Sequence, residues 1–358
     1  MSFHEILIAV MALFAVLGAL DRIFGNRWGL GKEFEEGILA MGSLALAMVG
    51  IVSLAPVLAG VLKPLVVPIY SFLGADPAMF AGTILASDMG GGALALEMTE
   101  DYRAAMLGGV LNGSMLGATI VFTIPVAMSI LREEDRPAMA KGVLCGIVTV
   151  PVGVLVGGLV AGFPVGLVLR NLVPIVVIAV LISLGLWKAE AAMVKGFGIF
   201  GKFVIALVTA GLAAAIVEEL TGFSVIPGMA PISEGFETVG TIAILLAGAF
   251  PLVYVLTRLL RRPLMAVGRK LGINDAAAAG LIASLANSIA TFGLVKDMNQ
   301  RGKVINIAFA VSAAFVFGDH LGFTAGFAPE MIGPMIAGKL AGGISAVAVA
   351  LWLTRKEL

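Results

Sequence analysis

Long apolar stretches recur along the whole chain and are separated by short polar intervals. Most of these stretches reach or exceed the ~18 residues at which an apolar run is interpreted as a membrane-spanning helix. The pattern therefore predicts an all-α polytopic membrane protein. The apolar segments comprise residues 3–21, 35–62, 77–98, 104–130, 138–161, 164–187, 197–217, 237–257, 275–295, 303–323 and 333–354.

Basic residues divide the polar intervals into two classes. The intervals rich in Lys and Arg are 22–32, 132–141, 188–202, 258–270 and 296–303. The intervals that share a single lysine, Lys63, are 63–76, 162–163, 218–235 and 324–338. Because basic loops stay on the cytoplasmic side, we expect the first class inside and the second outside. This assignment places the N-terminus outside and the C-terminus in the cytoplasm.

Two apolar segments cannot cross the membrane completely under this assignment. Segment 77–98 and the next segment both lie between the outer interval 63–76 and the inner interval 132–141, where only one crossing is allowed. Segment 275–295 lies between two inner intervals, 258–270 and 296–303. We interpret both as re-entrant hairpins, which are tolerated where protein buries them or water fills a cavity. The sequence then predicts about nine transmembrane helices plus two re-entrant hairpins.

The two predicted hairpins belong to an internal repeat. The string LGADPAMFAGTI (73–84) aligns with LGINDAAAAGLI (271–282). FEEG upstream and LEMTEDYR downstream are echoed in the same order by FETVG and VKDMNQRG. We expect a first transmembrane repeat over 1–187 and a second over 188–358. Because the two start on opposite sides of the membrane, the repeat is inverted, as in many secondary transporters, and the expected architecture is elevator-like.

The composition agrees with a chain embedded in a lipid bilayer. Hydrophobic residues make up 60% of the sequence, the mean hydropathy is +1.07, and 13% of residues are charged. The charged share is about half of the roughly 25% found in soluble domains. The formal net charge is zero and no block of like charges indicates a nucleic-acid partner. The single cysteine, Cys145, excludes an internal disulfide.

The tips of the two hairpins carry polar residues within apolar surroundings. The first tip reads SDMGGG, with Ser87 and Asp88, and the second reads SLANSIAT, with Asn287. Consecutive glycines can break a helix and leave backbone carbonyls free to face a ligand. A charged aspartate at the bilayer centre costs at least ~2.5–3.5 kcal/mol on insertion scales, which a cationic substrate would offset. Capping of the following half-helix is the alternative role for Asp88, and the two roles are compatible.

A second acidic position lies in segment 303–323, where Asp319 and His320 are far from either polar flank. Asp319 would provide a second carboxylate for a cation, and His320 a proton-linked neighbour or a hydrogen-bond donor. The alternative is a buried polar pair that fastens two helices. Binding of a cation requires that no lysine or arginine neutralises these acids.

Further polar residues are candidates for the same site. Asn112, Ser114 and Thr119 lie in one apolar segment, and Asn112 and Thr119 are seven residues apart, which favours one helix face. Helix packing is the favoured role for all three. Glu35 and Glu36 open the second apolar segment, where a favourable interaction with the helix dipole is the default. We treat these two glutamates as secondary candidates for substrate binding.

The sequence contains no motif of an enzyme. The one glycine-rich run lacks the lysine of a phosphate-binding loop, and no His and Glu spacing matches a zinc-binding HExxH motif. No GxSxG elbow accompanies the serines and histidines. We therefore expect no catalytic residue, no metal and no cofactor.

Several long strings resemble a known family. FEEGILAMGSLALAMVG, FAGTILASDMGG, GSMLGATIVFTIP, RGKVINIAFAVSAAFVFGDHLGF and PMIAGKLAGG are similar to the ethanolamine-utilisation transport protein family, EutH. The resemblance implies a permease of the bacterial inner (cytoplasmic) membrane that imports ethanolamine for breakdown inside a microcompartment. Two positions depart from the pattern, since Gly92 stands where the resemblance leads us to expect an aromatic residue and Ser87 where it leads us to expect cysteine.

The resemblance and the polar residues together predict how the substrate binds. Ethanolammonium is a small cation with one hydroxyl, so it needs a carboxylate for its charge and an amide or hydroxyl for the alcohol. Asp88 and Asp319 would bind the charge. The candidates for the alcohol are Ser87, Asn112, Asn287 and Ser312.

We expect a secondary carrier or facilitator that moves ethanolamine by alternating access. A channel-like facilitator and a proton- or sodium-coupled symporter for another small amine are the alternatives within transport. A receptor that senses ethanolamine is the alternative from another class, and it would need a cytoplasmic output module that the sequence does not indicate. A homo-oligomer remains compatible with the sequence.

Overall fold

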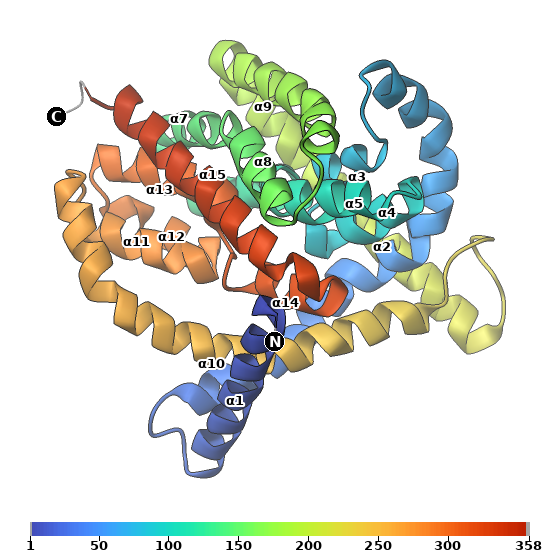
Figure 1. Cartoon of the computed structure of the whole chain (residues 1–358), viewed down its shortest axis with the longest axis horizontal. Coiled ribbons are helices and arrows are strands. Elements are labelled where there is room, and N and C mark those ends of the chain that lie inside the picture. Colours follow the sequence, from blue (N-terminus) through green and yellow to red (C-terminus); the bar gives the residue numbers. More distant parts are fainter. Residues whose placement is uncertain (1, 356–358) are drawn as a thin grey trace.

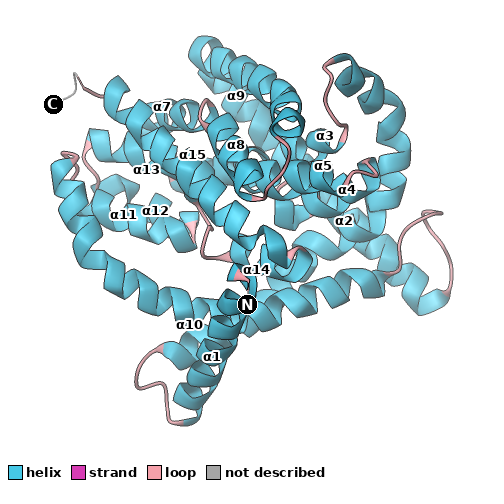
Figure 2. Cartoon of the chain, in the orientation of Figure 1, coloured by secondary structure: helices cyan, strands magenta, loops and turns pink. Residues whose placement is uncertain are grey.

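The computed structural model describes residues 2–355, with the side chains at positions 260, 264, 267 and 269 left undescribed. The end of the predicted second repeat, residues 356–358, lies outside this description together with the predicted cytoplasmic C-terminus. The described part of the chain consists of helices and loops without a strand (Figure 2). Seven helical segments within it are long and apolar enough to cross a membrane. The prediction of an all-helical, multi-pass membrane protein is confirmed at this level.

The elements follow one another as shown in Figure 1. The first half comprises α1 (Phe3–Ile23), α2 (Leu30–Phe72), α3 (Ala78–Ile84), η1 (Ser87–Met89), α4 (Gly91–Met98), α5 (Tyr102–Ala105), η2 (Met106–Gly117), η3 (Thr119–Thr123), α6 (Ile124–Ile130), η4 (Glu133–Asp135), α7 (Arg136–Ile147) and α8 (Val150–Val160). The second half comprises α9 (Val165–Thr221), α10 (Ile232–Lys270), α11 (Asp275–Ala286), α12 (Ser288–Leu294), η5 (Val295–Asp297), α13 (Gln300–Ala313), α14 (Asp319–Phe327), η6 (Pro329–Met331) and α15 (Ile332–Leu353).

Two long helices, α2 and α10, form a frame along one side of the molecule. They pack against each other over much of their length, α1 packs against both, and α9 packs against α2 (Figure 1). Helix α2 has 43 residues and therefore extends about 65 Å at 1.5 Å per residue, more than twice the ~30 Å of a hydrocarbon core. Helix α9 covers two predicted segments, which are separated by a kink at Ala189 with φ −145° and ψ 48°.

The remaining helices form a compact group beside this frame. Helix α8 packs against α15, α7 packs against α13, and α13 packs against α15. Small residues permit the closest of these approaches, since a Cβ added to Gly338 would lie 2.7 Å from the Gly153 carbonyl oxygen. Close packing through glycine is typical of helices in membranes and explains part of the high glycine content of the chain.

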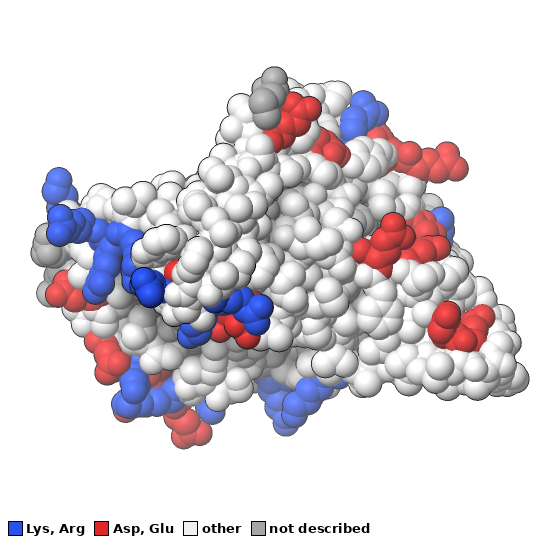
Figure 3. Space-filling model, turned by 90° about the horizontal axis from the view of Figure 1, so that it is seen from below, with Lys and Arg blue, Asp and Glu red and all other residues white. Residues whose placement is uncertain are grey.

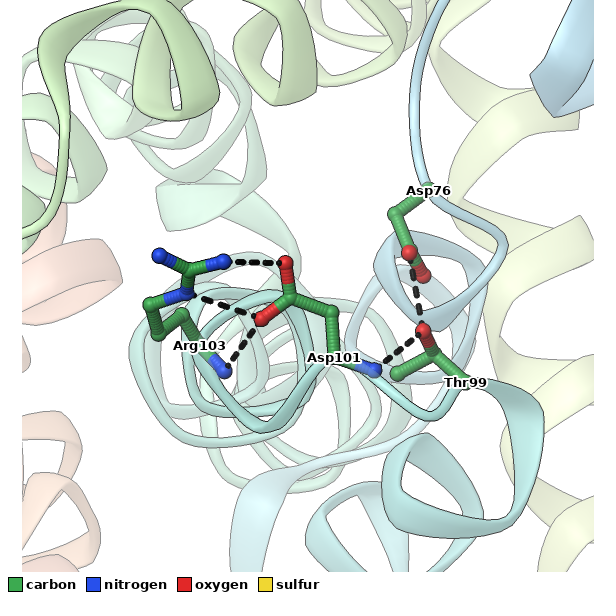
Figure 4. A network of polar contacts seen from close by, with 4 residues as sticks. All are labelled: Asp76, Thr99, Asp101 and Arg103. Carbon is green, nitrogen blue, oxygen red and sulfur yellow. Dashed lines mark hydrogen bonds and ion pairs between the residues drawn. The ribbon is translucent and has the colours of Figure 1, made fainter.

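The predicted first hairpin consists of two short helices, α3 and α4, that pack against each other. Its two ends are joined at the base, where Thr99 Oγ1 donates a hydrogen bond of 2.8 Å to Asp76 Oδ2 (Figure 4). The other oxygen of Asp76 accepts from the Ala78 backbone N–H at the start of α3. Arg103 donates three hydrogen bonds to Asp101 in the same network, two from its side chain and one from its backbone, and holds the pKa of that carboxyl below its usual value.

The predicted second hairpin, α11 and α12, is closed at its base in a similar way. Asn274 Nδ2 donates to the Asp297 carbonyl at 2.8 Å, and Asn299 Nδ2 donates to the Gly272 carbonyl at 3.0 Å. Each asparagine also caps the N-terminus of a helix: Asn274 caps α11, and Asn299 caps α13. Both helix pairs therefore have fixed ends, while their tips lie among the other helices.

Segment 303–323 is not the continuous helix that the sequence predicts. Helix α13 ends at Ala313 and α14 begins at Asp319. The backbone between them bonds to the end of α11 instead, with Phe315 N donating to the Ser284 carbonyl at 3.0 Å and Phe317 N to the Leu285 carbonyl at 2.8 Å. Phe315 adopts a φ of 63°, which non-glycine residues rarely adopt. These contacts between distant segments decide the break.

The helix over 102–130 also departs from the expected geometry. Its central parts, η2 and η3, are π-helical, with more residues per turn than an α-helix. The prediction that Asn112 and Thr119 share a helix face assumed α-helical spacing and is therefore wrong in its geometry. Both side chains are nevertheless completely buried.

Candidate functional site

The backbone at the tip of the first hairpin is irregular, and Asp88 at this tip lines an internal cavity. The chain is extended at Leu85 and Ala86, turns once through η1, and reaches Gly90 with a φ of 90° before α4 begins. A Cβ at Gly90 would lie 2.1 Å from Ile51, so both the conformation and the space require glycine. Helix α4 has no side-chain cap, so the alternative role of Asp88 as its cap is wrong.

Asp88 faces His320, which lies at the start of α14. The His320 Nε2 lies 3.6 Å from the Asp88 Oδ1, and the side chains are 3% and 16% exposed. The other ring nitrogen of His320, Nδ1, has no hydrogen-bond partner. The Phe315 ring lies against the imidazole with 5.3 Å between centroids. The broken helix thus meets the tip of the first hairpin at this pair.

Asp319 completes a group of three predicted residues. Asp88, Asp319 and His320 line one cavity of about 30 Å³, together with the aromatic rings of Phe122 and Phe315. Two carboxylates that line so small a cavity repel each other when both are ionised. Among the described residues, Asp319 has no hydrogen bond or ion pair to its carboxylate. The two acids therefore differ, because Asp88 has a basic neighbour and Asp319 has none bonded to it.

Lys339, a lysine of α15 that is completely buried, is not among the residues that the sequence predicts for the site. Its Nζ donates a hydrogen bond of 2.5 Å to the Ser114 carbonyl, and Gly113, the neighbour of Ser114, packs against the hairpin tip that carries Asp88. The requirement that no basic residue accompanies the acids is therefore not met at Asp88. A signal was available, because an ionisable residue inside an apolar membrane segment is a functional-site hypothesis by default.

Two larger cavities adjoin this cluster. The first, which we call the Glu97 cavity, has a volume of about 180 Å³ and contains Ser87 and Glu234 in its wall. The second, the Glu36 cavity, has a volume of about 340 Å³ and contains Glu33, Asn287 and Asp319 in its wall. Asp319 therefore lines both the small cavity and the Glu36 cavity.

The two larger cavities lie at different depths along the frame. Helix α2 lines the Glu36 cavity with Glu33 and Glu36 and the Glu97 cavity from Met48 onward. The twelve residues from 36 to 48 correspond to about 18 Å of helical rise. Helix α10 passes the cavities in the opposite order, lining the Glu97 cavity up to Thr238 and the Glu36 cavity from Phe250 onward. This opposite order indicates antiparallel helices with one cavity toward each end.

Two aromatic rings explain the unusual glycine of the first hairpin. A Cβ at Gly92 would lie 2.8 Å from the ring of Phe323, which stacks on Phe327 with 4.9 Å between centroids. Both phenylalanines also line the Glu97 cavity. The space that an aromatic residue at position 92 would need is therefore filled from α14. Ser87, the other departure, is buried and its Oγ has no hydrogen-bond partner.

The other predicted site residues lie outside the small cavity. Asn112 Nδ2 donates to Thr83 Oγ1 at 3.2 Å, and Thr119 Oγ1 donates to the Val311 carbonyl at 3.1 Å, which joins neighbouring helices. Ser114 Oγ donates within its own helix, and the buried Ser312 Oγ has no partner.

The two secondary candidates separate in the structure. Glu36 lines the cavity that bears its name, whereas Glu35 is paired with Arg22 at 3.2 Å on an exposed surface. Asn287 lines the Glu36 cavity, and its Oδ1 accepts from the Ile289 backbone N–H as the cap of α12. Within residues 2–355, no three His, Cys, Asp or Glu side chains gather as a metal site would require.

Comparison with known proteins gives a consistent answer over the whole chain. The family model described as "Ethanolamine utilisation protein, EutH" matches residues 3–353. The chain is 59% identical over 358 residues to the "Probable ethanolamine permease EutH" of Listeria monocytogenes, with all of this chain and 96% of that protein covered. It is 48% identical over 395 residues to the protein of the same name from Escherichia coli, with all of this chain and 97% of that protein covered. No solved structure matches the chain.

Proposed function

Because the chain belongs to the EutH family of ethanolamine utilisation proteins, whose named members are permeases and not enzymes, we propose that it carries ethanolamine across the bacterial inner membrane. The transported species is ethanolammonium, the protonated form. The observation that carries this proposal is the unpaired carboxylate of Asp319, which lines both a small aromatic-walled cavity and the larger Glu36 cavity.

The cavity at Asp319 suits a small organic cation. The carboxylate would bind the ammonium group, and the rings of Phe122 and Phe315 would lie against its charge, an arrangement that favours cations. The free Nδ1 of His320 would bind the alcohol. Ser87 and Asn287, on the two larger cavities, would bind the substrate on its way in or out.

The volume of the small cavity argues for a carrier that changes conformation. A cavity of about 30 Å³ accommodates about two water molecules. Ethanolammonium has four heavy atoms and is therefore too large for it. The surrounding helices must therefore separate for the substrate to bind. A permanently open channel would need a continuous passage of sufficient width at this point.

Alternating access would proceed between the Glu97 cavity and the Glu36 cavity. Each contains two glutamates, Glu97 and Glu234 in one and Glu33 and Glu36 in the other, which would attract cations toward the central cluster. We propose that the two hairpins and the helices that hold Asp88 and Asp319 move as a unit along the α2–α10 frame. This is the elevator-like movement expected from the sequence.

Two reciprocal contacts support the inverted repeat. Asp135, which precedes α7 in the first half, pairs with Lys303 of α13 in the second half. Glu330, which precedes α15 in the second half, accepts a hydrogen bond from Tyr102 of α5 in the first half. A two-fold relationship between the halves would produce contacts of this kind, one near each end of the compact group.

Nine membrane crossings follow if α9 crosses twice around its kink and α13 with α14 crosses once. Most Lys and Arg atoms lie toward the left and lower parts of the surface in Figure 3, and a broad area in its upper middle is uncharged. The positive-inside rule supports a cytoplasmic side that contains the basic segment 22–32, between α1 and α2, and the basic segment 258–270, at the end of α10. The N-terminus would then lie outside the cell.

Uptake into proteoliposomes tests the proposal. Purified protein should accelerate the entry of labelled ethanolamine and should exchange it rapidly for ethanolamine preloaded inside, as expected of a carrier. Imposed proton and sodium gradients, tested separately, determine whether transport is coupled. If proteoliposomes take up ethanolamine no faster than protein-free liposomes at a pH where the amine is protonated, the proposal is contradicted.

A further inference from the structure

Burial of the charged Lys339 side chain costs free energy, and one close hydrogen bond offsets part of this cost. Its side chain is completely inaccessible, and its Nζ donates to the Ser114 carbonyl at 2.5 Å. A carbonyl stabilises an ammonium group but does not neutralise it. A charged lysine inside a membrane protein requires an anion nearby.

The hairpin tip that carries Asp88 lies beside the carbonyl that holds Lys339. Gly113, the neighbour of Ser114, packs against the tip of the first hairpin, because a Cβ there would lie 3.1 Å from Ser87 N. The carbonyl that holds the ammonium group therefore lies beside the turn that carries Asp88.

The charged groups of the cluster do not cancel completely. Asp88 and Asp319 provide two carboxylates and Lys339 provides one ammonium group, and we count the His320 imidazole, whose Nε2 lies 3.6 Å from Asp88 Oδ1, as neutral. The ammonium group of Lys339 offsets one of the carboxylates. One negative charge remains, and it belongs to Asp319, which has no bonded partner among the described residues.

We infer that Lys339 is a resident counter-cation that leaves the site one net negative charge and so restricts it to amines with a single positive charge. This inference rests on the proposed function and adds the charge class of its substrate. An amine with two positive charges would leave the buried site with excess positive charge, which is costly away from water. A sodium ion bound together with ethanolammonium would do the same.

Competition binding to the purified full-length protein tests the inference. The probe is labelled ethanolamine, and the competitor is 1,3-diaminopropane, which is doubly protonated at neutral pH. Wild-type protein should bind ethanolamine equally with and without sodium and should favour it over the diamine by about tenfold or more, or about 1.4 kcal/mol. A wild-type protein that binds both equally overturns the inference and leaves the proposed function standing. A wild-type protein that binds no ethanolamine overturns both.

The variant Lys339→Met removes the charge and keeps an unbranched apolar side chain. It should bind ethanolamine more weakly and the diamine more tightly, so that the ratio of affinities shifts toward the diamine by about tenfold or more. Lys63→Met, which removes an exposed lysine, is the matched control and should keep the wild-type ratio. An unchanged ratio in folded Lys339→Met protein overturns the inference.

A double variant separates the charge count from the fold. Asp88→Asn alone should lose ethanolamine binding, because it leaves the cluster without net charge. Asp88→Asn combined with Lys339→Met restores one net negative charge and should recover ethanolamine binding with the preference over the diamine. Binding by the double variant that is no better than by Asp88→Asn overturns the inference.

Discussion

His320 Nε2 lies 3.6 Å from Asp88 Oδ1, and this pair joins α14 to the tip of the first hairpin. The two residues are 232 positions apart in the sequence, and neither lies in the middle of a regular helix. Asp319, next to His320, is therefore held toward the small cavity while its own carboxylate stays unpaired. The following predictions depend on this difference between the two acids.

Asp319→Asn should reduce ethanolamine uptake by about tenfold or more, because it removes the carboxylate that binds the ammonium group. The protein should still insert and fold, since the substitution breaks no hydrogen bond or ion pair of the described residues. Uptake by proteoliposomes with matched protein content measures the effect. Glu35→Gln, an equivalent change at a surface ion pair worth little in water, is the control and should transport normally.

Asp88→Asn should also abolish uptake, but for a second reason that affects stability. On our assignment it leaves the buried ammonium group of Lys339 without an anion, and an uncompensated buried charge destabilises the fold. The thermal unfolding temperature should therefore fall for Asp88→Asn and not for Asp319→Asn. Equal unfolding temperatures of the two variants would show that Lys339 does not depend on Asp88.

The pair of Asp135 and Lys303 should stabilise the compact group of helices. Both side chains are nearly inaccessible, with 1% and 9% exposed, so Lys303→Met should lower the free energy of unfolding by about 3–5 kcal/mol. The double variant with Asp135→Asn should recover much of this loss, because no unpaired charge remains. Chemical or thermal unfolding in detergent measures both. A double variant less stable than the single one would contradict the account.

The bases of the two hairpins should each contribute to stability. Thr99→Val removes both the hydrogen bond to Asp76 and the one from the Asp101 backbone N–H, and should cost about 2 kcal/mol. Asn299→Ala removes both the cap of α13 and the bond to the Gly272 carbonyl, and should cost about 2 kcal/mol. Hydrogen exchange of the hairpin amides measures the loosening. The control is Glu100→Gln, which changes the exposed residue next to Thr99 and should have no effect.

Much of the fold and part of the site follow from local sequence signals. Apolar length predicts the helices, and the glycines after Asp88 predict the break at the first tip, because Gly90 needs a positive φ and has no room for a side chain. The same reasoning selects Asp88 and Asp319, since an acid in lipid needs a function. These residues come from separate segments and meet in one cavity.

Other features depend on contacts that no local pattern reveals. The break after Ala313 arises because Phe315 and Phe317 bond to the distant end of α11, whereas the residues of the break are mostly apolar and continue the hydrophobic segment. Lys339 was overlooked because the orientation rule counts basic residues in the polar intervals and ignores one within a segment. Its relation to Asp88 depends on how α15 packs against η2.

The most direct test of the account is an experimental structure of the protein with ethanolamine bound. The account predicts the ammonium nitrogen within hydrogen-bond distance of the Asp319 carboxylate, with Lys339 still held by the Ser114 carbonyl beside Asp88. Ethanolamine bound elsewhere, or Asp319 paired with a lysine or arginine of the protein, would contradict it.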